Sequence, residues 1–304
     1  MVIKRSFLNR IAEDLVVAKI IDGKKISQEI IEELIIEVQA FRETHNVIPG
    51  LAVVLVGEDP SSEVYVRNKI KRATEVGIHS TKHILSAATS QVDLIETIQG
   101  LNNDPAVHGI LVQLPLSKHI DEKAVIEAIH PDKDVDGFHP INVGGLVAGT
   151  ATLKPCTPYG CMLLLKSIHP DLSGKLAVVV GRSNIVGKPM ASMLLQADCS
   201  VITVHSRSQN IEQLCSQADI IIAAVGRPKM INTDWVKRGA TVIDVGINVV
   251  DIDGKRKLVG DVDFNDIEPL VHAITPVPGG VGPMTIACLM KNTLTAAQNQ
   301  VLSK

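Results

Sequence analysis

The chain has 304 residues, a formal net charge of −3, 45% hydrophobic residues and a positive mean hydropathy. It is long enough for two domains with well-filled cores, and this composition argues against disorder. Because the charge is near neutral and no long Lys/Arg block occurs, we expect no nucleic-acid or membrane partner and a small-molecule substrate. Aromatic residues make up only 2%, so the cores must be built from aliphatic residues, as in α/β proteins.

The cysteines and the N-terminal residues further restrict the class of protein and its expected location. The five cysteines are odd in number and form no C-x-x-C pair, which argues against a disulfide framework and a metal site. No apolar run approaches the roughly 18 residues of a membrane span, and a cytoplasmic location fits best. Residues 1–17 mix basic and apolar side chains, but Glu13 and Asp14 weaken a transit-peptide interpretation, so we expect an unstructured or packed extension.

The N-terminal half alternates helix and strand patterns, as expected of βα units. The predicted helices begin at Ser27, at Ser61 or Ser62, and at Asp121, and the predicted buried strands are Gly50–Gly57 and Gly109–Leu114. The first of these helices carries an apolar stripe formed by Ile30, Leu34, Val38 and Phe41. Residues 134–150 have the composition of a loop.

The C-terminal half repeats this alternation. The predicted strands are Lys175–Val180, Val201–His205, Asp219–Val225 and Ala240–Gly246. Their spacing is typical of a doubly wound, Rossmann-like parallel sheet. We therefore expect an N-terminal domain of residues 1–155 and a second domain of residues 156–283. The helix pattern after Pro283, with its apolar face of Ala287, Met290, Leu294 and Ala297, is expected to return to the first domain, which residues 284–304 would complete.

The first candidate site is Gly181–Gly187, a turn between a predicted strand and a predicted helix. Backbone N–H groups and the positive end of the helix dipole can hold a dinucleotide pyrophosphate there. Ser183 replaces the usual middle glycine, so a plain structural turn remains an alternative. No acidic residue follows the next strand to bind a ribose 2′-hydroxyl. Arg182, Ser206 and Arg207 instead favour the 2′-phosphate of NADP, unless the arginines are only surface residues.

Tyr65 and Lys69 lie one turn apart on the second predicted helix. The apolar stripe of that helix is separate, so the phenol and the ammonium either line a cleft and exchange protons or are simply exposed. The same Tyr-x-x-x-Lys spacing occurs in short-chain dehydrogenases, but there it follows the glycine-rich turn. Here it precedes the turn by more than a hundred residues, so that family is a poor match.

Three more segments carry candidate residues. Gln113 lies at the carboxyl end of a predicted strand, where ligands of α/β proteins collect. Asp136 belongs to the segment Asp134–Phe138 and is a candidate ligand-binding carboxylate. The alternative is that one of the two aspartates only caps a turn, which the Asp-Gly pair also favours. In Thr275–Thr285, six of eleven residues are Pro or Gly. This loop predicts either a stiff backbone wall for a flat ligand or a structural turn.

Six segments together resemble the bifunctional methylenetetrahydrofolate dehydrogenase/methenyltetrahydrofolate cyclohydrolase family. They are Tyr65–Lys69, Gly109–Pro115, His130–Pro140, Lys154–Pro158, Gly181–Pro189 and Thr275–Pro283. The resemblance covers the chain from about Ala18 onward, and only residues 1–17 depart from it. It implies two α/β domains with a folate between them, NADP on the second domain, and a homodimer formed through that domain.

The resemblance also implies residue roles. Lys69 is the catalytic lysine of the cyclohydrolase step, Tyr65 and Gln113 assist it, and Asp136 holds the pterin. The implied substrate-binding set further contains Val112, Leu114, Pro278, Gly279, Gly280, Val281 and Gly282. The implied cofactor contacts are Gly181, Arg182, Ser183, Ser206, Arg207 and Ile247.

The implied activity has two steps, NADP-dependent oxidation of 5,10-methylenetetrahydrofolate to the methenyl form and its hydrolysis to 10-formyltetrahydrofolate. Two alternatives stay open at the level of sequence. A shikimate-type dehydrogenase would explain the turn at Gly181–Gly187 but not the loop at Thr275–Thr285. A folate-binding protein without turnover would explain the loop but would make Lys69 dispensable.

Overall fold

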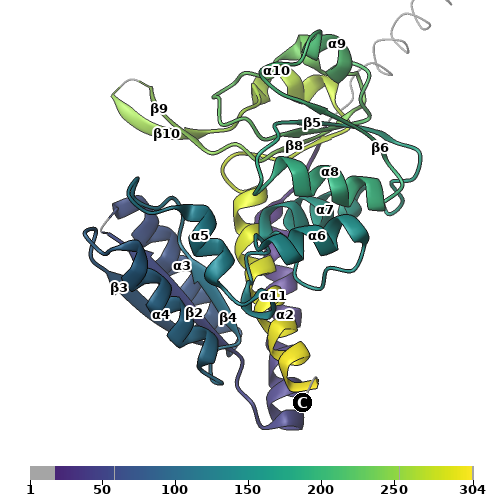
Figure 1. Ribbon diagram of the computed structural model, residues 1–304. Coiled ribbons are helices and arrows are strands. Elements are labelled where there is room, and N and C mark those ends of the chain that lie inside the picture. The colour runs from purple at the N-terminus through teal and green to yellow at the C-terminus, as the bar shows by residue number, and fades with distance from the viewer. Residues whose placement is uncertain (1–17, 58, 253, 303–304) are drawn as a thin grey trace, which may run out of the picture. The chain divides into compact units, whose positions relative to one another are not determined.

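The computed structural model describes residues 18–57, 59–252 and 254–302, which form two units (Figure 1). One unit contains residues 18–24 and Cys161–Pro283, and the other contains Lys25–Gly160 and residues 284–302. The expectations for residues 1–17 lie outside the described part of the chain. Within the described part, no helix is both long and apolar enough to cross a membrane.

The N-terminal unit is built around a parallel three-stranded sheet with the order β3-β2-β4. Its strands are β2 (Gly50–Val56), β3 (His79–Leu85) and β4 (Gly109–Val112). The helical elements are α2 (Gly23–His45), α3 (Pro60–Glu75), α4 (Gln91–Asn103), α5 (Glu122–Ala128), the 3-10 turn η1 (Pro131–Lys133), α6 (Pro140–Ala148), the start of α7 (Cys156–Ile168) and α11 (Val281–Leu302). Ala52 and Val54 of the central strand are fully buried against Leu94 and Ile98 of α4.

Three elements of this unit were not predicted. β3 is an edge strand with the sequence HSTKHIL and no buried residue, so it lacks the apolar run by which its neighbours were identified. α4 was also overlooked, although Ser90 caps it by accepting a hydrogen bond from the Asp93 N–H at 3.2 Å. α6 lies in the expected loop, where the His139 ring accepts from the Ile141 N–H at 3.1 Å and Pro140 occupies the first turn.

Helix α2 also differs from its prediction. It begins at Gly23, and Ser27 is a buried residue inside it. Ile31 lies in the buried stripe where the sequence predicted Ile30, together with Leu34, Val38 and Phe41 as expected. Gly23 packs so closely against the Gly280 carbonyl that a Cβ atom would clash with it, so a glycine is needed at the first residue of the helix.

The second unit contains a parallel six-stranded sheet with the order β1-β11-β8-β7-β5-β6, which confirms the Rossmann-like prediction. The strands are β1 (Lys19–Ile20), β5 (Leu176–Val180), β6 (Ser200–Val204), β7 (Ile220–Ala223), β8 (Thr241–Asp244) and β11 (Ala273–Ile274). The other elements are α8 (Gly187–Gln196), α9 (Ile211–Cys215), η2 (Thr233–Trp235), the antiparallel hairpin β9 (Asn248–Ile252) and β10 (Lys255–Val259), α10 (Phe264–Ile267) and η3 (Glu268–Leu270). The two-residue strands β1 and β11 were too short to be predicted.

Two observations bear on the expected domain limits. β1 pairs with β11, so residues 18–24 belong with the second sheet and not with the N-terminal domain to which the sequence assigned them. The division between the units falls at Gly160 and Cys161, because α7 continues without a break across the expected limit at residues 155 and 156.

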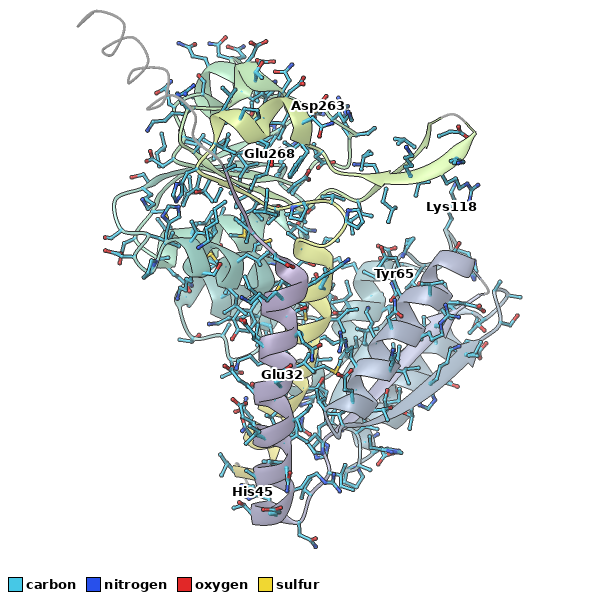
Figure 2. All side chains as sticks on the ribbon, turned by 180° about the vertical axis from the view of Figure 1, so that it is seen from behind. Glu32, His45, Tyr65, Lys118, Asp263 and Glu268 are labelled. Atoms are coloured by element: carbon cyan, nitrogen blue, oxygen red, sulfur yellow. The ribbon has the colours of Figure 1, made fainter. Side chains whose placement is uncertain are left out.

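The terminal helix α11 belongs to the N-terminal unit, as predicted, and runs beside α2 (Figures 1 and 2). Its predicted apolar face, Ala287, Met290, Leu294 and Ala297, is buried. The buried Asn292 amide donates at 2.8 Å to the carbonyls of Val135 and Lys154. The helix therefore holds two backbone segments near Asp136, one at the preceding residue Val135 and one at Lys154, which contacts Gly137.

Candidate active site

Lys69 of α3 and Gln113, which follows β4, form a preorganised pair. The Lys69 ammonium donates to Gln113 Oε1 at 3.0 Å, and Gln113 Nε2 donates to the Leu114 carbonyl at 2.7 Å. The Gln113 N–H also donates to the Val54 carbonyl of the central strand at 2.9 Å. The oxygen and the nitrogen of the Gln113 side-chain amide are thus both hydrogen-bonded, and the oxygen faces Lys69.

Tyr65 lies one turn before Lys69 on α3, and Figure 2 shows it at the surface of that helix. Its side chain is 44% exposed, whereas Val66 and Ala73 on the core face of the helix are fully buried. No residue in the described part of the chain forms a hydrogen bond with its hydroxyl, so the phenol is available to a ligand.

Asp134 is the capping carboxylate of the loop after η1. It is 1% exposed and accepts hydrogen bonds from the Gly137 N–H at 3.1 Å, the His139 N–H at 2.7 Å and the Asn142 amide at 2.9 Å. Burial raises the pKa of Asp134, and the hydrogen bonds from Asn142 and His139 oppose that rise. This carboxylate holds the turn and has little capacity left for a ligand.

Asp136, two residues later, is in the opposite situation. It is half-buried, and its carboxylate accepts no hydrogen bond from the described residues. Desolvation raises the pKa of Asp136 to about 6, the positive charge of Lys69 opposes the rise, and Asp134 adds to it. A carboxylate that lacks donors but lies in the field of a lysine is suited to bind a ligand that brings N–H groups.

Gly137 explains how Asp136 is placed beside Lys69. Its φ is +76°, and an added Cβ would lie 2.5 Å from the Pro155 nitrogen, so only glycine fits at this crossing of two segments. A parallel bridge between Ile110 and Asp134 aligns the segment with β4. The structure thereby brings Lys69, Gln113 and Asp136 together from three separate segments.

Val112 and Leu114 flank Gln113 in the predicted substrate set. Val112 is 5% exposed and packs in the core of the N-terminal unit, so its side chain supports the strand end. Leu114 contributes the carbonyl oxygen that orients the Gln113 amide.

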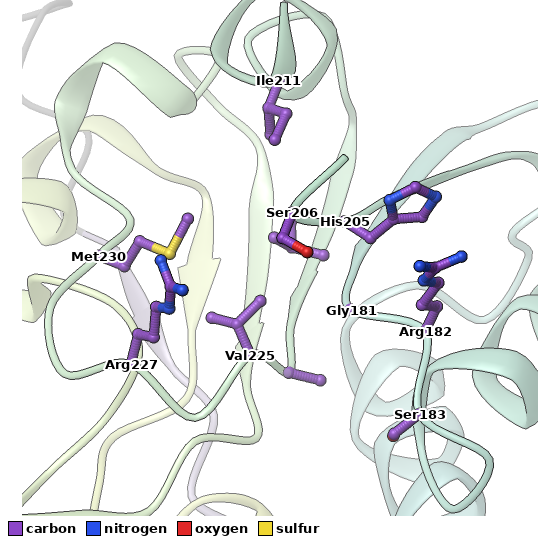
Figure 3. Close-up of a pocket in the computed structure, with 11 residues that line it drawn as sticks. Gly181, Arg182, Ser183, His205, Ser206, Ile211, Val225, Arg227 and Met230 are labelled. Atoms are coloured by element: carbon purple, nitrogen blue, oxygen red, sulfur yellow. The ribbon is translucent and has the colours of Figure 1, made fainter. Parts of the chain in front are cut away.

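A second site is a cavity of about 330 Å³ in the other unit (Figure 3). Its lining residues are Val180, Gly181, Arg182, Ser183, His205, Ser206, Ile211, Ala224, Val225, Arg227 and Met230. They lie where β5, β6 and β7 end, the usual ligand edge of a doubly wound sheet. The cavity brings together Gly181, Arg182, Ser183 and Ser206, as expected, but Arg207 and Ile247 are not among its lining residues.

Sequence inspection missed the other side of this cavity. Ile211, Val225, Arg227 and Met230 come from two later segments, after β6 and β7. No local pattern marks them, because isolated apolar residues and arginines are common in loops that bind nothing. The carboxyl end of β7 was the available signal, since neighbouring strand ends of a parallel sheet share one edge.

The turn at Gly181–Gly187 is closely packed. Gly181 has φ +125°, and a Cβ on Gly187 would clash with the Gly181 carbonyl. The Ser183 hydroxyl accepts hydrogen bonds from the Val186 and Gly187 N–H groups at 3.1 and 3.3 Å. The sequence suggested that donors at the start of α8 are open to a pyrophosphate, and Ser183 already occupies two of them.

The loop Thr275–Pro283 is held at both ends of its glycine stretch. The Lys24 N–H donates to the Gly279 carbonyl at 3.0 Å, and the Gly280 N–H donates to the Pro276 carbonyl at 2.9 Å. Gly279 has φ +112°, which favours glycine. Ile247 lies beside the loop, because a Cβ on Gly282 would be 3.8 Å from Ile247 Cδ1. These contacts fix parts of the loop backbone, and they are compatible with both the ligand wall and the structural turn that its Pro and Gly content predicted.

Two family models match the chain. The model described as "Tetrahydrofolate dehydrogenase/cyclohydrolase, catalytic domain" matches residues 21–136, and the model described as "Tetrahydrofolate dehydrogenase/cyclohydrolase, NAD(P)-binding domain" matches residues 155–301. The two matches together cover most of the chain.

Individual relatives agree. "Bifunctional protein FolD 3" of Ectopseudomonas mendocina is 59% identical over 282 residues, which covers 93% of this chain and 92% of that protein. The crystal structure of the bifunctional enzyme FolD of Campylobacter jejuni has a TM-score of 0.89 at 48% identity, covering 93% of this chain and 99% of the other. The Trypanosoma brucei FolD, solved with NADP cofactor and an inhibitor, has a TM-score of 0.89 at 38% identity, covering 93% and 98%.

Proposed function

The chain belongs to the tetrahydrofolate dehydrogenase/cyclohydrolase family, and from this premise we propose which residues perform its two reactions. It is a bifunctional enzyme, a dehydrogenase and a cyclohydrolase acting on methylenetetrahydrofolate. The membership decides against the shikimate-type dehydrogenase that the sequence left open. The observation that carries the residue assignment is the 3.0 Å hydrogen bond from Lys69 to Gln113 near Asp136, whose carboxylate accepts no hydrogen bond from the residues that the structure describes.

In the cyclohydrolase step, water attacks the methenyl carbon and the imidazoline ring opens to the 10-formyl product. Protons must leave the attacking water and reach the departing nitrogen. We assign this transfer to Lys69, whose position is fixed by Gln113, with the Tyr65 hydroxyl one turn away on the same helix. The Lys69 ammonium gives a proton to the departing nitrogen, and the amine so formed takes up the proton released by the attacking water. Gln113 cannot itself exchange a proton at neutral pH, so its part is to orient the lysine.

We assign substrate binding to two sets of residues. Asp136 accepts the pterin N–H groups, since within the described part of the chain nothing donates a hydrogen bond to its carboxylate. Pro278, Gly279, Gly280, Val281 and Gly282 supply a backbone surface without large side chains, fixed by the hydrogen bonds of Gly279 and Gly280. A flat ring can approach such a surface closely.

In the dehydrogenase step the substrate loses a hydride from its methylene carbon, and NADP⁺ supplies the acceptor. The cavity at Gly181 fits this cofactor, because it combines a close-packed glycine turn with the cationic Arg182 and the Ser206 hydroxyl. We assign the 2′-phosphate to Arg182 and Ser206, with Arg207 as a further contact, and we keep Ile247, which lies beside the Thr275–Pro283 loop, as a cofactor contact. The substrate nitrogens expel the hydride, so these residues act by positioning and no protein base is needed.

A coupled assay tests the proposal. Purified protein is incubated with 5,10-methylenetetrahydrofolate and NADP⁺ while NADPH and methenyl absorbance are followed together. We expect NADPH to form with little methenyl accumulation, because the cyclohydrolase consumes it. Methenyl accumulation equal to NADPH would remove the cyclohydrolase assignment, and absence of NADPH would remove the dehydrogenase assignment.

We further propose a homodimer formed through the cofactor-binding unit and a cytoplasmic location, both on the basis of the family. Light scattering coupled to size-exclusion chromatography measures the mass directly. A mass of one chain would contradict the dimer.

A further inference from the structure

Asp261, between β10 and α10, is a buried carboxylate to which neither reaction assigns a role. It is 0% exposed. No positively charged side chain compensates it by a salt bridge within the described residues. A buried charge is costly unless hydrogen bonds replace its hydration, so its surroundings should reveal what it does.

The Asp261 carboxylate is saturated by N–H donors from one turn. Oδ2 accepts from the Val225 N–H at 2.7 Å and the Gly226 N–H at 3.0 Å, and Oδ1 accepts from the Arg227 N–H at 2.9 Å. The Asn248 amide gives a fourth bond, to Oδ1 at 2.9 Å. Three successive backbone N–H groups can converge on one carboxylate only if the backbone curls around it, and Gly226 has φ +65°.

The turn held in this way is one side of the cofactor cavity. Val225 and Arg227 line the cavity, as does Met230 three residues later (Figure 3). The backbone around Asp261 extends the attachment, because the Lys229 N–H donates to the Gly260 carbonyl at 3.0 Å and the Ile231 N–H to the Asp261 carbonyl at 2.9 Å. The whole segment from Val225 to Ile231 is therefore attached to residues 260 and 261.

Asp261 is itself held by a second buried carboxylate, that of Asp244 at the end of β8. Asp244 accepts from the N–H groups of Asp261, Val262 and Gly246, each at 3.0 Å. The backbone N–H of Asp244 donates to the Thr275 hydroxyl at 2.7 Å. Asp261 is thus joined to the end of β8 and, through Thr275, to the segment that follows β11.

We propose that Asp261 is a positioning residue for the cofactor: its carboxylate holds the Val225–Arg227 turn in the conformation that binds NADP. The assignment rests on the proposed dehydrogenase function but not on the cyclohydrolase residues, which lie in the other unit. Because Arg227 lines the cavity and its N–H is bound to Asp261, we also assign its side chain as a cofactor contact. The sequence did not suggest this residue.

Asp261→Asn tests the proposal, because an amide would turn one acceptor oxygen into a donor that faces the N–H groups of the turn. We expect the KM and Kd for NADP⁺ to rise at least about tenfold, since a turn that loses hydrogen bonds to a charged group occupies its binding conformation less often. The cyclohydrolase rate, measured from methenyltetrahydrofolate without cofactor, should stay within about twofold of wild type, since its residues are untouched. Asp266→Asn is the matched control, because that aspartate is exposed on the nearby helix α10 and lies outside the Val225–Ile231 segment.

If Asp261→Asn does not fold, a pair of glycine variants tests whether NADP⁺ binding depends on the conformation of the Val225–Arg227 turn. Gly226→Ala strains the turn at φ +65°, and Gly239→Ala imposes similar strain at φ +81° elsewhere in the same unit. Neither added methyl would meet another atom within 4 Å. We expect only Gly226→Ala to raise the KM for NADP⁺, while both variants lose similar stability in urea.

The outcomes are distinguishable. Unchanged NADP⁺ affinity in Asp261→Asn, equal loss of both activities in that variant, or identical cofactor kinetics for the two glycine variants would each overturn the positioning role. A wild-type protein that binds no NADP⁺ would instead overturn the dehydrogenase assignment on which it rests.

Discussion

Asp136 and Asp261 are both withdrawn from water, yet their surroundings differ completely. Asp261 is fully buried and accepts four hydrogen bonds, three of them from the backbone of a single turn. Asp136 is half-buried, accepts none from the described residues, and has a pKa raised to about 6. One carboxylate is fully engaged by the protein, and the other retains its acceptor capacity.

This difference indicates how to separate ligand-binding from scaffold aspartates in such a protein. A desolvated carboxylate without donors is unfavourable for folding, so its presence beside the Lys69–Gln113 pair suggests that a ligand completes it. A carboxylate with saturated oxygens acts on the ligand only through the backbone that it holds. Asp134, with three donors, belongs with Asp261 in this respect.

The largest expected effect comes from removing the cation beside Asp136. Lys69→Met should lower the cyclohydrolase rate by roughly 10²–10⁴-fold, the usual contribution of a positioned proton carrier. Dehydrogenase activity should remain measurable, because hydride transfer needs no base. Lys71→Met, an exposed lysine on the same helix, is the control. Parallel loss of both activities would show that Lys69 serves substrate binding alone.

Replacing Asp136 tests whether a carboxylate without protein donors binds the ligand. Asp136→Ala should raise the folate KM of both reactions by about 10- to 150-fold, as expected for loss of hydrogen bonds to a charged group worth roughly 1.5–3 kcal/mol. Initial rates at varied folate concentration measure it, and Asp132→Ala, an exposed aspartate nearby, is the control. Unchanged folate affinity would mean that Asp136, like Asp134, belongs to the turn.

In the cofactor cavity, the arginine side chains allow a similar test. Arg182→Ala should weaken NADP⁺ binding by about ten- to a hundredfold and leave NAD⁺ nearly unaffected, because a charge-assisted phosphate contact is worth roughly 1.5–3 kcal/mol. Arg207→Ala should have a smaller effect, since Arg207 does not line the cavity. Steady-state kinetics with both cofactors decide it. Equal losses for NADP⁺ and NAD⁺ would place Arg182 at the turn or the pyrophosphate.

The protonation state of Asp136 predicts a pH dependence. With a pKa of about 6, the carboxylate is ionised above this pH and protonated below it. The folate KM should therefore rise as pH falls below about 6, approaching tenfold per unit. The same profile measured for Asp136→Asn should be flat in this range. A wild-type profile that is flat between pH 5 and pH 7 would contradict the raised pKa.

The smallest expected effect is on stability. A carboxyl pKa raised from 3.8 to about 6 means that the folded protein binds the proton more tightly than the unfolded chain does. The contribution of Asp136 to stability therefore falls as pH rises from about 4 through 6. Asp136→Asn should be more stable than wild type at pH 8 and similar to it below pH 4, because the amide never becomes a desolvated charge. Urea unfolding at the two pH values measures the difference, and a less stable variant at pH 8 would contradict it.

The sequence by itself determined the class of fold and most of the residues proposed for function. Buried strands such as Leu176–Val180 are continuous aliphatic runs, and the face of α11 repeats with the helical period, so both are visible locally. Lys69, Gln113 and Asp136 could also be identified as candidates from the local sequence motifs around them. Their spacing did not show whether they meet, because they belong to separate segments.

Only the tertiary structure decided which polar groups remain open to a ligand. It showed that Asp134 is saturated and Asp136 is not, that Ser183 occupies donors at the start of α8, and that Arg227 lines the cofactor cavity. It also added β1 and β11, two-residue strands stabilised by their neighbours in the sheet. Hydrophobic periodicity is a local property of the chain, whereas the saturation of a carboxylate depends on donors from distant segments, as Asp261 and Val225 illustrate.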